Sequence, residues 1–359
     1  MTGEDREAAV QARIEAFRRR PPKLHDTHIT TAHGAGGKAS AALVHGVFLP
    51  AFGNATLDVL DDAAVLDARP GRIALTTDSY VVSPRRFAGG SIGDLAVNGT
   101  VNDLAMVGAV PCWLTAAFVI EEGFTVEELR AITADMAAAA ALASVTIVAG
   151  DTKVVARGAA DGLYITTAGV GFVPDGRHLA AERVEVGDRV VVSGPIGDHG
   201  IAVLLARGDL ALEADVDSDT APLNHLVDVL LAAVPATRWL RDPTRGGVAS
   251  AVNELAVAAG VGIALDEAAI PVRPTVAAAC ELLGIDALYV ANEGRLVAVV
   301  PAADVDAALA ALRGDRLGRE AAVIGEVVAQ PPGMVTLATR FGGVRIVDLL
   351  VGDPLPRIC

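Results

Sequence analysis

Cysteine, lysine and aromatic residues are scarce in this chain of 359 residues. The three cysteines, Cys112, Cys280 and Cys359, show no CxxC spacing, which argues against a structural zinc or iron–sulfur site and fits a reducing compartment. Aromatic residues make up only 4% of the chain although hydrophobic residues make up 52%, so the core must consist mainly of Ala, Val, Leu and Ile. We expect Cys112 and Cys280, which lie in apolar surroundings, to be inert core residues.

Basic residues and long apolar runs are lacking as well. The net charge of −15 argues against nonspecific nucleic-acid binding, because a phosphate backbone needs a basic surface. No apolar run approaches the length of a membrane span, and residues 1–20 mix acids with arginines instead of forming the apolar core of a signal peptide. We therefore expect a cytoplasmic protein that binds neither nucleic acid nor membrane, with a short charged helix over residues 4–20.

The apolar pattern predicts two α/β halves, each of which mixes short Val/Ile strands with Ala/Leu helices. The length also suits two domains. Turn residues interrupt the pattern at Pro174-Asp175-Gly176, where we place the boundary. The expected strands are 73–77, 113–120, 145–149, 163–172, 188–193, 261–265, 295–300 and 323–329. The expected helices are 91–108, 125–143, 199–207, 222–233, 245–259, 274–283 and 302–312.

Carboxylates recur at the edges of apolar stretches in the first half. Four segments share this arrangement, and they contain Asp62, Asp78, Asp103 and Asp151. A single Asp in such a position normally caps a helix or forms a turn. Four of them can instead converge on a hard cation, because Mg²⁺ prefers oxygen ligands and holds substrate phosphates through only a few carboxylates. In an acidic protein such a metal makes polyphosphate binding electrostatically feasible.

Only three lysines are present, and two of them lie in motif-like segments. Lys38 closes the stretch HGAGGK, in which the backbone amides around Gly36 and Gly37 can approach phosphates closely. The stretch is not a Walker A loop, because Ala39 stands where Ser or Thr is required, and a flexible linker is the alternative.

The other lysine of this kind, Lys153, follows the expected strand 145–149 within Gly150-Asp151-Thr152-Lys153. Strand ends are common ligand sites in α/β architectures. The alternative is a tight turn with solvated charges.

The second half contributes polar loops of its own. Residues 193–200 and 241–247 place glycines before expected helices, where free amides favour anions, although pure capping is an alternative. Glu293, in Asn292-Glu293-Gly294 before the strand at 295–300, is either an unpaired acid at the mouth of a cleft or a turn residue.

The final residue is a cysteine, which can carry a chemical group into and out of a cleft. Asp353-Pro354-Leu355-Pro356 precedes it, and the two prolines favour an extended segment. The alternative is a frayed terminus whose thiol is only an oxidation liability.

Taken in order, these motifs resemble those of the HypE family, the carbamoyl dehydratases of NiFe-hydrogenase maturation. The resemblance runs from Ala32 to Cys359, and GDTKVV at 150–155 together with the terminal PRIC is its most specific part. The other matching segments are HGAGGK (33–38), TDSYVV (77–82), GGSIGDLAVNGTVNDLAMVGA (89–109), SGPIGDHG (193–200), DPTRGGV (242–248) and ANEG (291–294). Isolated pieces are also similar to aminoimidazole ribonucleotide synthetase and selenophosphate synthetase.

The resemblance implies a fold and an organisation. The fold class is α/β of the α+β type, a two-domain aminoimidazole ribonucleotide synthetase-like fold with mixed sheets packed by helices and a flexible C-terminal tail. The implied divisions are an N-terminal extension (1–28), an ATP-binding and dimerisation domain (29–174), a C-terminal α/β domain (175–342) and a tail (343–359). The family is implied to form a homodimer through the N-terminal domains and to bind ATP in a cleft.

The resemblance also implies a reaction. HypF carbamoylates the terminal cysteine, the resulting S-carboxamide is dehydrated with ATP to a thiocyanate, and cyanide passes to iron held by the HypC–HypD complex. By this resemblance Asp62, Asp78, Asp103 and Asp242 are magnesium ligands. The phosphates of ATP are expected near Gly36, Gly37, Lys38, Asp103, Asp151 and Lys153.

The chemistry assigns further roles. Cys359 is the carrier, Lys153 stabilises charge on the transferring phosphoryl group, and Glu293 is the expected base, with His199 as a second choice. The alternatives are a selenophosphate or aminoimidazole synthetase, a kinase of the same superfamily, and a noncatalytic thiol carrier in metallocluster assembly.

Overall fold

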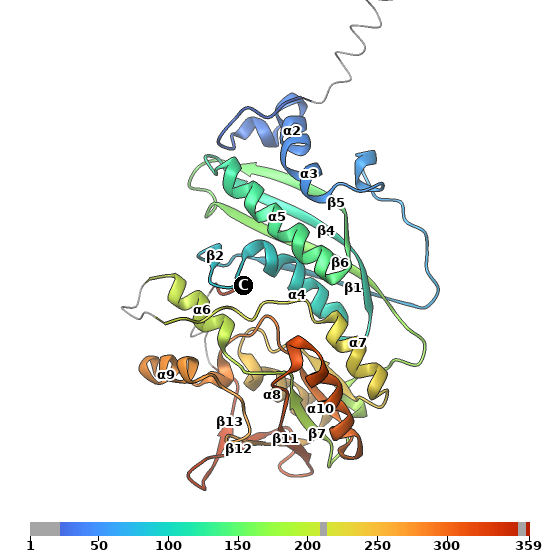
Figure 1. Ribbon diagram of the computed structural model, residues 1–359, viewed down its shortest axis with the longest axis vertical. Helices are drawn as coiled ribbons and strands as arrows, with labels where there is room; N and C mark the ends of the chain where they lie inside the picture. Colours follow the sequence, from blue (N-terminus) through green and yellow to red (C-terminus); the bar gives the residue numbers. More distant parts are fainter. Residues whose placement is uncertain (1–21, 209–213, 351–356) are drawn as a thin grey trace, which may run out of the picture.

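The computed structural model describes residues 22–208, 214–350 and 357–359. These residues form two halves, each built of one large sheet and the helices packed on it, which lie one above the other in Figure 1. The helix expected at 4–20 and the proline segment Asp353–Pro356 lie outside the described residues.

The first half is a four-stranded sheet in the order β1-β6-β4-β5. The β4–β5 pair is parallel and the other two pairs are antiparallel. Helices α4 and α5 cover one face (Figure 1), and each begins at a hydroxyl cap that accepts from backbone N–H groups, Ser91 for α4 and Thr125 for α5. The elements are β1 (Arg72–Tyr80), α4 (Ile92–Met106), β4 (Val110–Glu121), α5 (Val126–Ala143), β5 (Thr146–Val155) and β6 (Leu163–Val173).

On the opposite face of this sheet, the described chain leaves two large apolar side chains of the edge strand largely exposed. On the edge strand β1, Ile73 is 67% exposed and Leu75 is 74% exposed. The smaller elements of this half are η1 (Thr31–Gly34), α2 (Gly37–Leu43), η2 (Val44–Phe48), α3 (Leu49–Phe52), η3 (Leu57–Val59), β2 (Arg86–Phe87) and β3 (Gly90–Ser91). These exposed apolar side chains form a surface on which another polypeptide chain can pack.

The second half is a seven-stranded sheet in the order β13-β12-β9-β11-β7-β10-β8. Its core joins the buried faces of β7, β9 and β10 to α8. Its strands are β7 (Arg189–Val192), β8 (Trp239–Arg241), β9 (Gly262–Asp266), β10 (Val297–Val300), β11 (Ala322–Val328), β12 (Val335–Ala338) and β13 (Val344–Val347). Its helices are α6 (Asp198–Ala206), α7 (Asn224–Ala233), α8 (Gly247–Ala259), α9 (Pro274–Leu283) and α10 (Val305–Gly314), with η4 (Ala181–Arg183), η5 (Ala287–Tyr289), η6 (Ala302–Asp304) and η7 (Arg316–Gly318).

A crossing segment, residues 214–223, runs from the second half across the first and joins them. Ser218 donates its backbone N–H to the carbonyl of Ala88 at 2.8 Å. The buried amide of Asn102 on α4 donates to the carbonyl of Ala221 at 3.1 Å and accepts from the N–H of Leu223 at 2.7 Å. A buried amide with both ends satisfied fixes one arrangement of the two halves.

The structure confirms the α/β fold class and the expected mixture of sheets and helices. Sequence patterning misses the short strands β8, β12 and β13, whereas it finds the equally short β7 and β10 because they contain continuous apolar runs. Residues 344–347 were expected in the tail but form β13, which pairs with β12 and so belongs to the second sheet. The domain boundaries themselves remain a prediction.

A membrane-spanning helix is not found in the part of the chain that the structure describes.

We predict that Gly294→Ala destabilises the fold by about 2–3 kcal/mol, the range for overpacking at a site that cannot yield. A Cβ at this position would lie 1.7 Å from the backbone oxygen of Asp219 in the crossing segment. Gly314→Ala at the end of α10 is the control, because a Cβ there meets nothing within 4 Å. Urea unfolding measures both variants, and equal stability of the two would contradict this account of the crossing segment.

Candidate functional site

The end of the chain, Arg357–Cys359, lies between the two halves, beside β2 and α6 in Figure 1. Its backbone pairs with the chain just after β1: the N–H of Val81 donates to the carbonyl of Cys359 at 3.1 Å, and that of Ser83 donates to Arg357 at 3.2 Å. The side chain of Ile358 is only 3% exposed and packs in the core of the first half. The terminal thiol is therefore docked inside the molecule.

Arginine side chains secure this docked end. Arg357 forms an ion pair with Asp161 at 2.6 Å and donates from Nε to the carbonyl of Val81 at 3.1 Å. Arg207, the residue that follows α6, donates to the carbonyls of Ser83 and Arg357, both at 2.9 Å. These bonds are made to the backbone and to Arg357, so they leave the cysteine side chain out of the anchoring.

The thiol of Cys359 accepts a hydrogen bond from Nε of Arg245 at 3.0 Å. Burial, together with the charge of Glu293 and against the opposing effect of Arg245, raises the pKa of this thiol to about 11. The docked sulfur is therefore a neutral thiol at neutral pH, and it lies within electrostatic range of Glu293.

Four carboxyl groups gather around this position. Asp78 comes from β1, Asp103 from α4, Asp242 from the loop after β8, and Glu293 from the loop before β10. Burial and the charge of Asp103 raise the pKa of Asp242 to about 7. The pKa of Glu293 lies well above its usual range because of burial and then the charge of Asp242. Each half of the chain supplies two of the four acids.

These carboxyl groups fit a cation. Among the described residues, the buried Oε1 atom of Glu293 has no hydrogen-bond partner, and the Asp103 carboxylate accepts a hydrogen bond from the hydroxyl of Thr76 at 2.8 Å. Nearby like charges disfavour ionisation, whereas a bound cation reverses this effect. Among the described residues, however, no three His, Cys, Asp or Glu side chains are already arranged to hold a metal ion. Oxygen atoms from a ligand or water would have to complete such a site.

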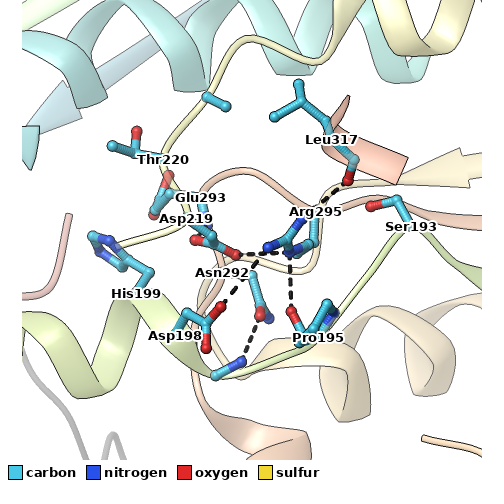
Figure 2. Close-up of polar contacts among 12 residues, drawn as sticks. Ser193, Pro195, Asp198, His199, Asp219, Thr220, Asn292, Glu293, Arg295 and Leu317 are labelled. Atoms are coloured by element: carbon cyan, nitrogen blue, oxygen red, sulfur yellow. Dashed lines mark hydrogen bonds and ion pairs between the residues drawn. The ribbon is translucent and has the colours of Figure 1, made fainter. Parts of the chain in front are cut away.

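The segment that carries Glu293 is held rigidly by its neighbours (Figure 2). Arg295 donates to the carbonyl of Pro195 at 2.9 Å and to that of Leu317 at 3.1 Å, and it lies 3.5 Å from a carboxylate oxygen of Asp219. The N–H of Glu293 donates to Asp219 at 2.9 Å. The buried guanidinium thus fixes the backbone on both sides of the acid.

The loop at 193–200 has a structural role that the sequence left open. The N–H of Gly197 donates to the side-chain oxygen of Asn292 at 2.7 Å, and Asp198 pairs with Arg273 at 2.9 Å and with Arg295 at 3.8 Å. The amide of Asn292 also donates to the carbonyl of Pro243 at 3.0 Å, which ties this loop to the loop of Asp242. The arrangement favours the capping alternative over an anion site.

A second group of predicted residues lies elsewhere, around a cavity of about 540 Å³ in the first half. Its walls include Gly36 of the glycine-rich stretch and an aromatic cluster of Phe48, Phe52 and Phe118. Its polar side is formed by Asp62, Asp151 and Lys153, and Lys153 pairs with Asp151 at 2.6 Å. This hydrogen bond lowers the pKa of Asp151. The cavity combines an apolar floor with charge at one side.

The structure corrects three expectations about this second group. Asp151 and Lys153 do not follow a strand but lie within β5, whose parallel pairing with β4 continues through both residues. Gly37 and Lys38 are exposed at the start of α2 and do not line the cavity. Asp62 lies with Asp151 and Lys153, so the four expected magnesium ligands do not converge within one chain.

The pairing registers show how far apart the two groups are. Asp78 on β1 lies opposite Thr167 on β6, which lies opposite Ala116 on β4 and then Gly150 on β5. They form one row across the sheet, from one edge to the other. Three interstrand spacings separate its ends, or about 14 Å. One chain therefore presents the acid cluster and the cavity at opposite edges of a single sheet.

His199 does not have the geometry of the second base that the sequence analysis offered. Its Nε2 lies 2.7 Å from the carbonyl oxygen of Ile358 and its Nδ1 lies 2.8 Å from the hydroxyl of Ser218. Both ring nitrogens are therefore already engaged. Burial also lowers the pKa of this histidine to about 4, which makes it a poorer proton acceptor than an ordinary histidine.

Sequence reasoning missed two residues that the fold brings to the site. Arg245 contacts the sulfur of Cys359, and Asp219 holds the backbone of Glu293. Arg245 carries a usable signal, because it lies three residues after Asp242 in the same glycine-containing loop. Asp219 carries none, because it lies in an irregular segment whose path only the tertiary structure defines.

Comparison with known proteins agrees with this architecture. Residues 60–173 match the family "AIR synthase related protein, N-terminal domain", and residues 185–337 match the corresponding C-terminal domain. The carbamoyl dehydratase HypE of Rhodobacter capsulatus is 55% identical over 340 residues, which cover 94% of this chain and 99% of that protein.

Solved structures agree as well. A structure of hydrogenase maturation protein HypE in complex with ATP has a TM-score of 0.88 at 44% identity and covers 92% of this chain and 99% of its own. A structure of a HypE–HypF complex has a TM-score of 0.76 at 47% identity and covers 86% of this chain and 100% of its own. The chain therefore belongs to the HypE family of carbamoyl dehydratases.

Proposed function

We propose that this enzyme dehydrates an S-carboxamide on Cys359 to a thiocyanate with ATP and so supplies cyanide for hydrogenase maturation. The single observation that carries the proposal is the docked terminal thiol, held beside Glu293 between the two halves of the chain. The half-buried thiol lies where the charges of Glu293 and Asp78 act on it. The family to which the chain belongs gives the reaction its class.

The residues have distinct roles in this reaction. The carboxamide oxygen attacks the γ-phosphoryl group of ATP and displaces ADP. The phosphorylated oxygen then leaves carbon as inorganic phosphate while the nitrogen gives up its two protons, and carbon and nitrogen form the nitrile. Glu293, a buried carboxylate with a raised pKa, is suited to take a proton from the carboxamide nitrogen. Arg245 lies at the sulfur and orients the group attached to it. Exclusion of water by the docked tail protects the activated carboxamide from hydrolysis.

We place the nucleotide in the cavity of the first half. A solved HypE of 44% identity binds ATP, and the cavity here offers an aromatic floor, the backbone of Gly36 and the ammonium of Lys153. Gly36 has a φ of +83°, a conformation that lets the backbone approach a phosphate without a Cβ. Gly37 and Lys38 follow it on the exposed side. Mg²⁺, which supplies charge neutralisation to the phosphates, would be held by Asp62 and Asp151 together with Asp78, Asp103 and Asp242.

We propose a homodimer that joins the two groups of residues. The uncovered face of the first sheet, with Ile73 and Leu75, suits a second copy of the same chain. A two-fold axis through this face would set the β5 edge of each copy over the β1 edge of the other. Lys153 of one copy would then lie near Asp78 of its partner, although about 14 Å separate the two edges within one sheet.

The proposed partners follow from the family. A solved structure contains HypE with HypF, and we propose HypF as the donor of the carbamoyl group to Cys359. We propose a HypC–HypD complex as the acceptor of cyanide. The described cysteines are all free, which suits a step in the cytoplasm.

Mass spectrometry of the C-terminal peptide tests the proposed reaction. After incubation with HypF, carbamoyl phosphate and ATP, we expect Cys359 to gain a carbamoyl group and then to lose one water in the presence of ATP. Cys359→Ser should give neither product and keep its affinity for ATP, since the thiol is placed at the acid cluster and not in the cavity. Glu293→Gln should accumulate the carboxamide. An unmodified tail alongside another phosphorylated product would contradict the proposal.

Mixed dimers test the shared site. Lys153→Ala and Glu293→Gln, co-expressed with different tags, should each be inactive alone and should recover about a quarter of the wild-type sites when mixed at random. The matched control is Glu293→Gln mixed with Cys359→Ser, which should recover nothing, because both changes fall in the same cleft. Equal failure of both mixtures would place the complete site within one chain.

The raised pKa of Asp242 predicts a pH-dependent stability in the absence of metal. The folded state binds this proton more tightly than the unfolded state does, so the contribution is present below about pH 4 and is lost as the pH rises through about 7. At full size it amounts to about 4 kcal/mol. Urea unfolding at about pH 5 and about pH 8 should show that the free energy of unfolding decreases less between these pH values for Asp242→Asn than for the wild type.

Magnesium should raise the stability of the wild type more at the higher pH, because the cation stabilises the charged carboxylates. The exposed Asp67 provides the control variant, Asp67→Asn, which should behave like the wild type. The same decrease with pH in wild type and Asp242→Asn would show that the acid cluster does not titrate as described.

A further inference from the structure

A buried histidine makes a side-chain contact with the backbone of the docked tail. His199 lies in the first turn of α6, is fully buried, and packs edge-on against the ring of Phe87 at a centroid distance of 5.5 Å. Its ring lies between Ile358 on one side and Ser218 of the crossing segment on the other. It therefore connects the end of the chain to the segment that joins the two halves.

The direction of each hydrogen bond in this group is determined. A backbone carbonyl can only accept, so Nε2 of His199 carries the proton and donates it to Ile358. In a neutral ring Nδ1 must then accept from the hydroxyl of Ser218, and that hydroxyl in turn accepts from the N–H of Thr220 at 3.1 Å. The ring is held in one tautomer and one orientation.

We propose that His199 is a positioning residue: its N–H fixes the register of the tail by holding the carbonyl next to Cys359. The bonded carbonyl belongs to the residue directly before the cysteine, so a change in its position moves the sulfur by a similar amount. Release of the tail would leave a buried N–H donor without an acceptor, which favours the docked arrangement.

The inference rests on the proposed function in one respect: the proposed function identifies the chemical group that Cys359 carries. Docking of the tail is a property of the free protein, so it can be measured without ATP, HypF or any modification. A failure of the proposed reaction would leave the docking measurement unaffected, and the two outcomes are distinguishable.

Alkylation of Cys359 measures the docking directly. Full-length protein is treated with iodoacetamide at mildly alkaline pH, and labelling of the peptides that contain Cys112, Cys280 and Cys359 is followed separately by mass spectrometry. The half-buried thiol should react slowly in the wild type. In His199→Phe, which keeps an aromatic ring and removes the donor, the Cys359 rate should rise about fivefold to tenfold, the factor expected for one lost hydrogen bond.

Two further variants separate the hydrogen bond from the shape of the ring. His199→Gln keeps an N–H donor at a similar reach and should restore most of the protection. Ser218→Ala leaves the ring in place but no longer fixes its tautomer, so its Cys359 rate should lie between those of the wild type and His199→Phe. Circular dichroism will show whether His199→Phe folds. If it does not fold, Ser218→Ala takes its place in the alkylation test. Unchanged labelling at Cys112 and Cys280 shows that any change is local to the tail.

The dehydration step then distinguishes positioning from proton transfer. In single-turnover measurements on carbamoylated protein, His199→Phe should be slowed and His199→Gln largely rescued, with ATP affinity unchanged in both. Equal alkylation rates in wild type, His199→Phe and Ser218→Ala would overturn the proposal. The proposal would also be overturned if both His199→Phe and His199→Gln lost dehydration while Cys359 stayed protected from alkylation. That pattern would indicate that His199 acts as a base.

Discussion

Repulsion among carboxyl groups in a poorly solvated cleft is the constraint on which the rest of this site depends. Asp242 and Glu293 are buried: burial and the charge of Asp103 raise the pKa of Asp242, and burial and the charge of Asp242 raise the pKa of Glu293. Such a cluster is costly in the folded protein unless a cation shares it, which explains why it occurs where two halves of a chain meet and not inside either core. Burial, and then the charges of Glu293 and Asp78, keep the nearby sulfur of Cys359 protonated, so the cleft suits a thiol derivative better than a free thiolate.

The tail is held in a way that separates anchoring from chemistry. Its bonds to Arg207 and to His199 and two of its bonds to residues 81–83 involve the backbone of residues 357–359, while the side chain of Arg357 reaches Asp161 and the carbonyl of Val81. The cysteine side chain is left to the contact with Arg245. A chain end anchored in this way can present different groups on the same sulfur without losing its anchors, and it can be withdrawn by breaking local contacts only.

The first sheet sets the distance that the chemistry must bridge. Its edge strands β1 and β5 carry the acid cluster and the charged side of the cavity, and the pairing register keeps them about 14 Å apart. A sheet cannot shorten this distance, because the strand spacing is fixed by hydrogen bonding. An exposed apolar face on the same sheet offers the geometrical solution, since a second copy related by a two-fold axis reverses the order of the edges.

The sequence by itself determined the fold class, the long helices and strands, and the residue types of the chemistry, because apolar periodicity and short motifs are local properties. It also identified Glu293 and the terminal thiol as candidates. It placed Asp151 and Lys153 after a strand, because polar residues at an edge strand do not follow a buried pattern. Only the tertiary structure decided that Asp62 lies apart from Asp78, Asp103 and Asp242 and that Arg245 meets the sulfur. It also gave His199 two bonds that engage both ring nitrogens. These facts depend on strand order and on the path of irregular segments, and contacts between residues far apart in the chain leave no periodic trace in the sequence.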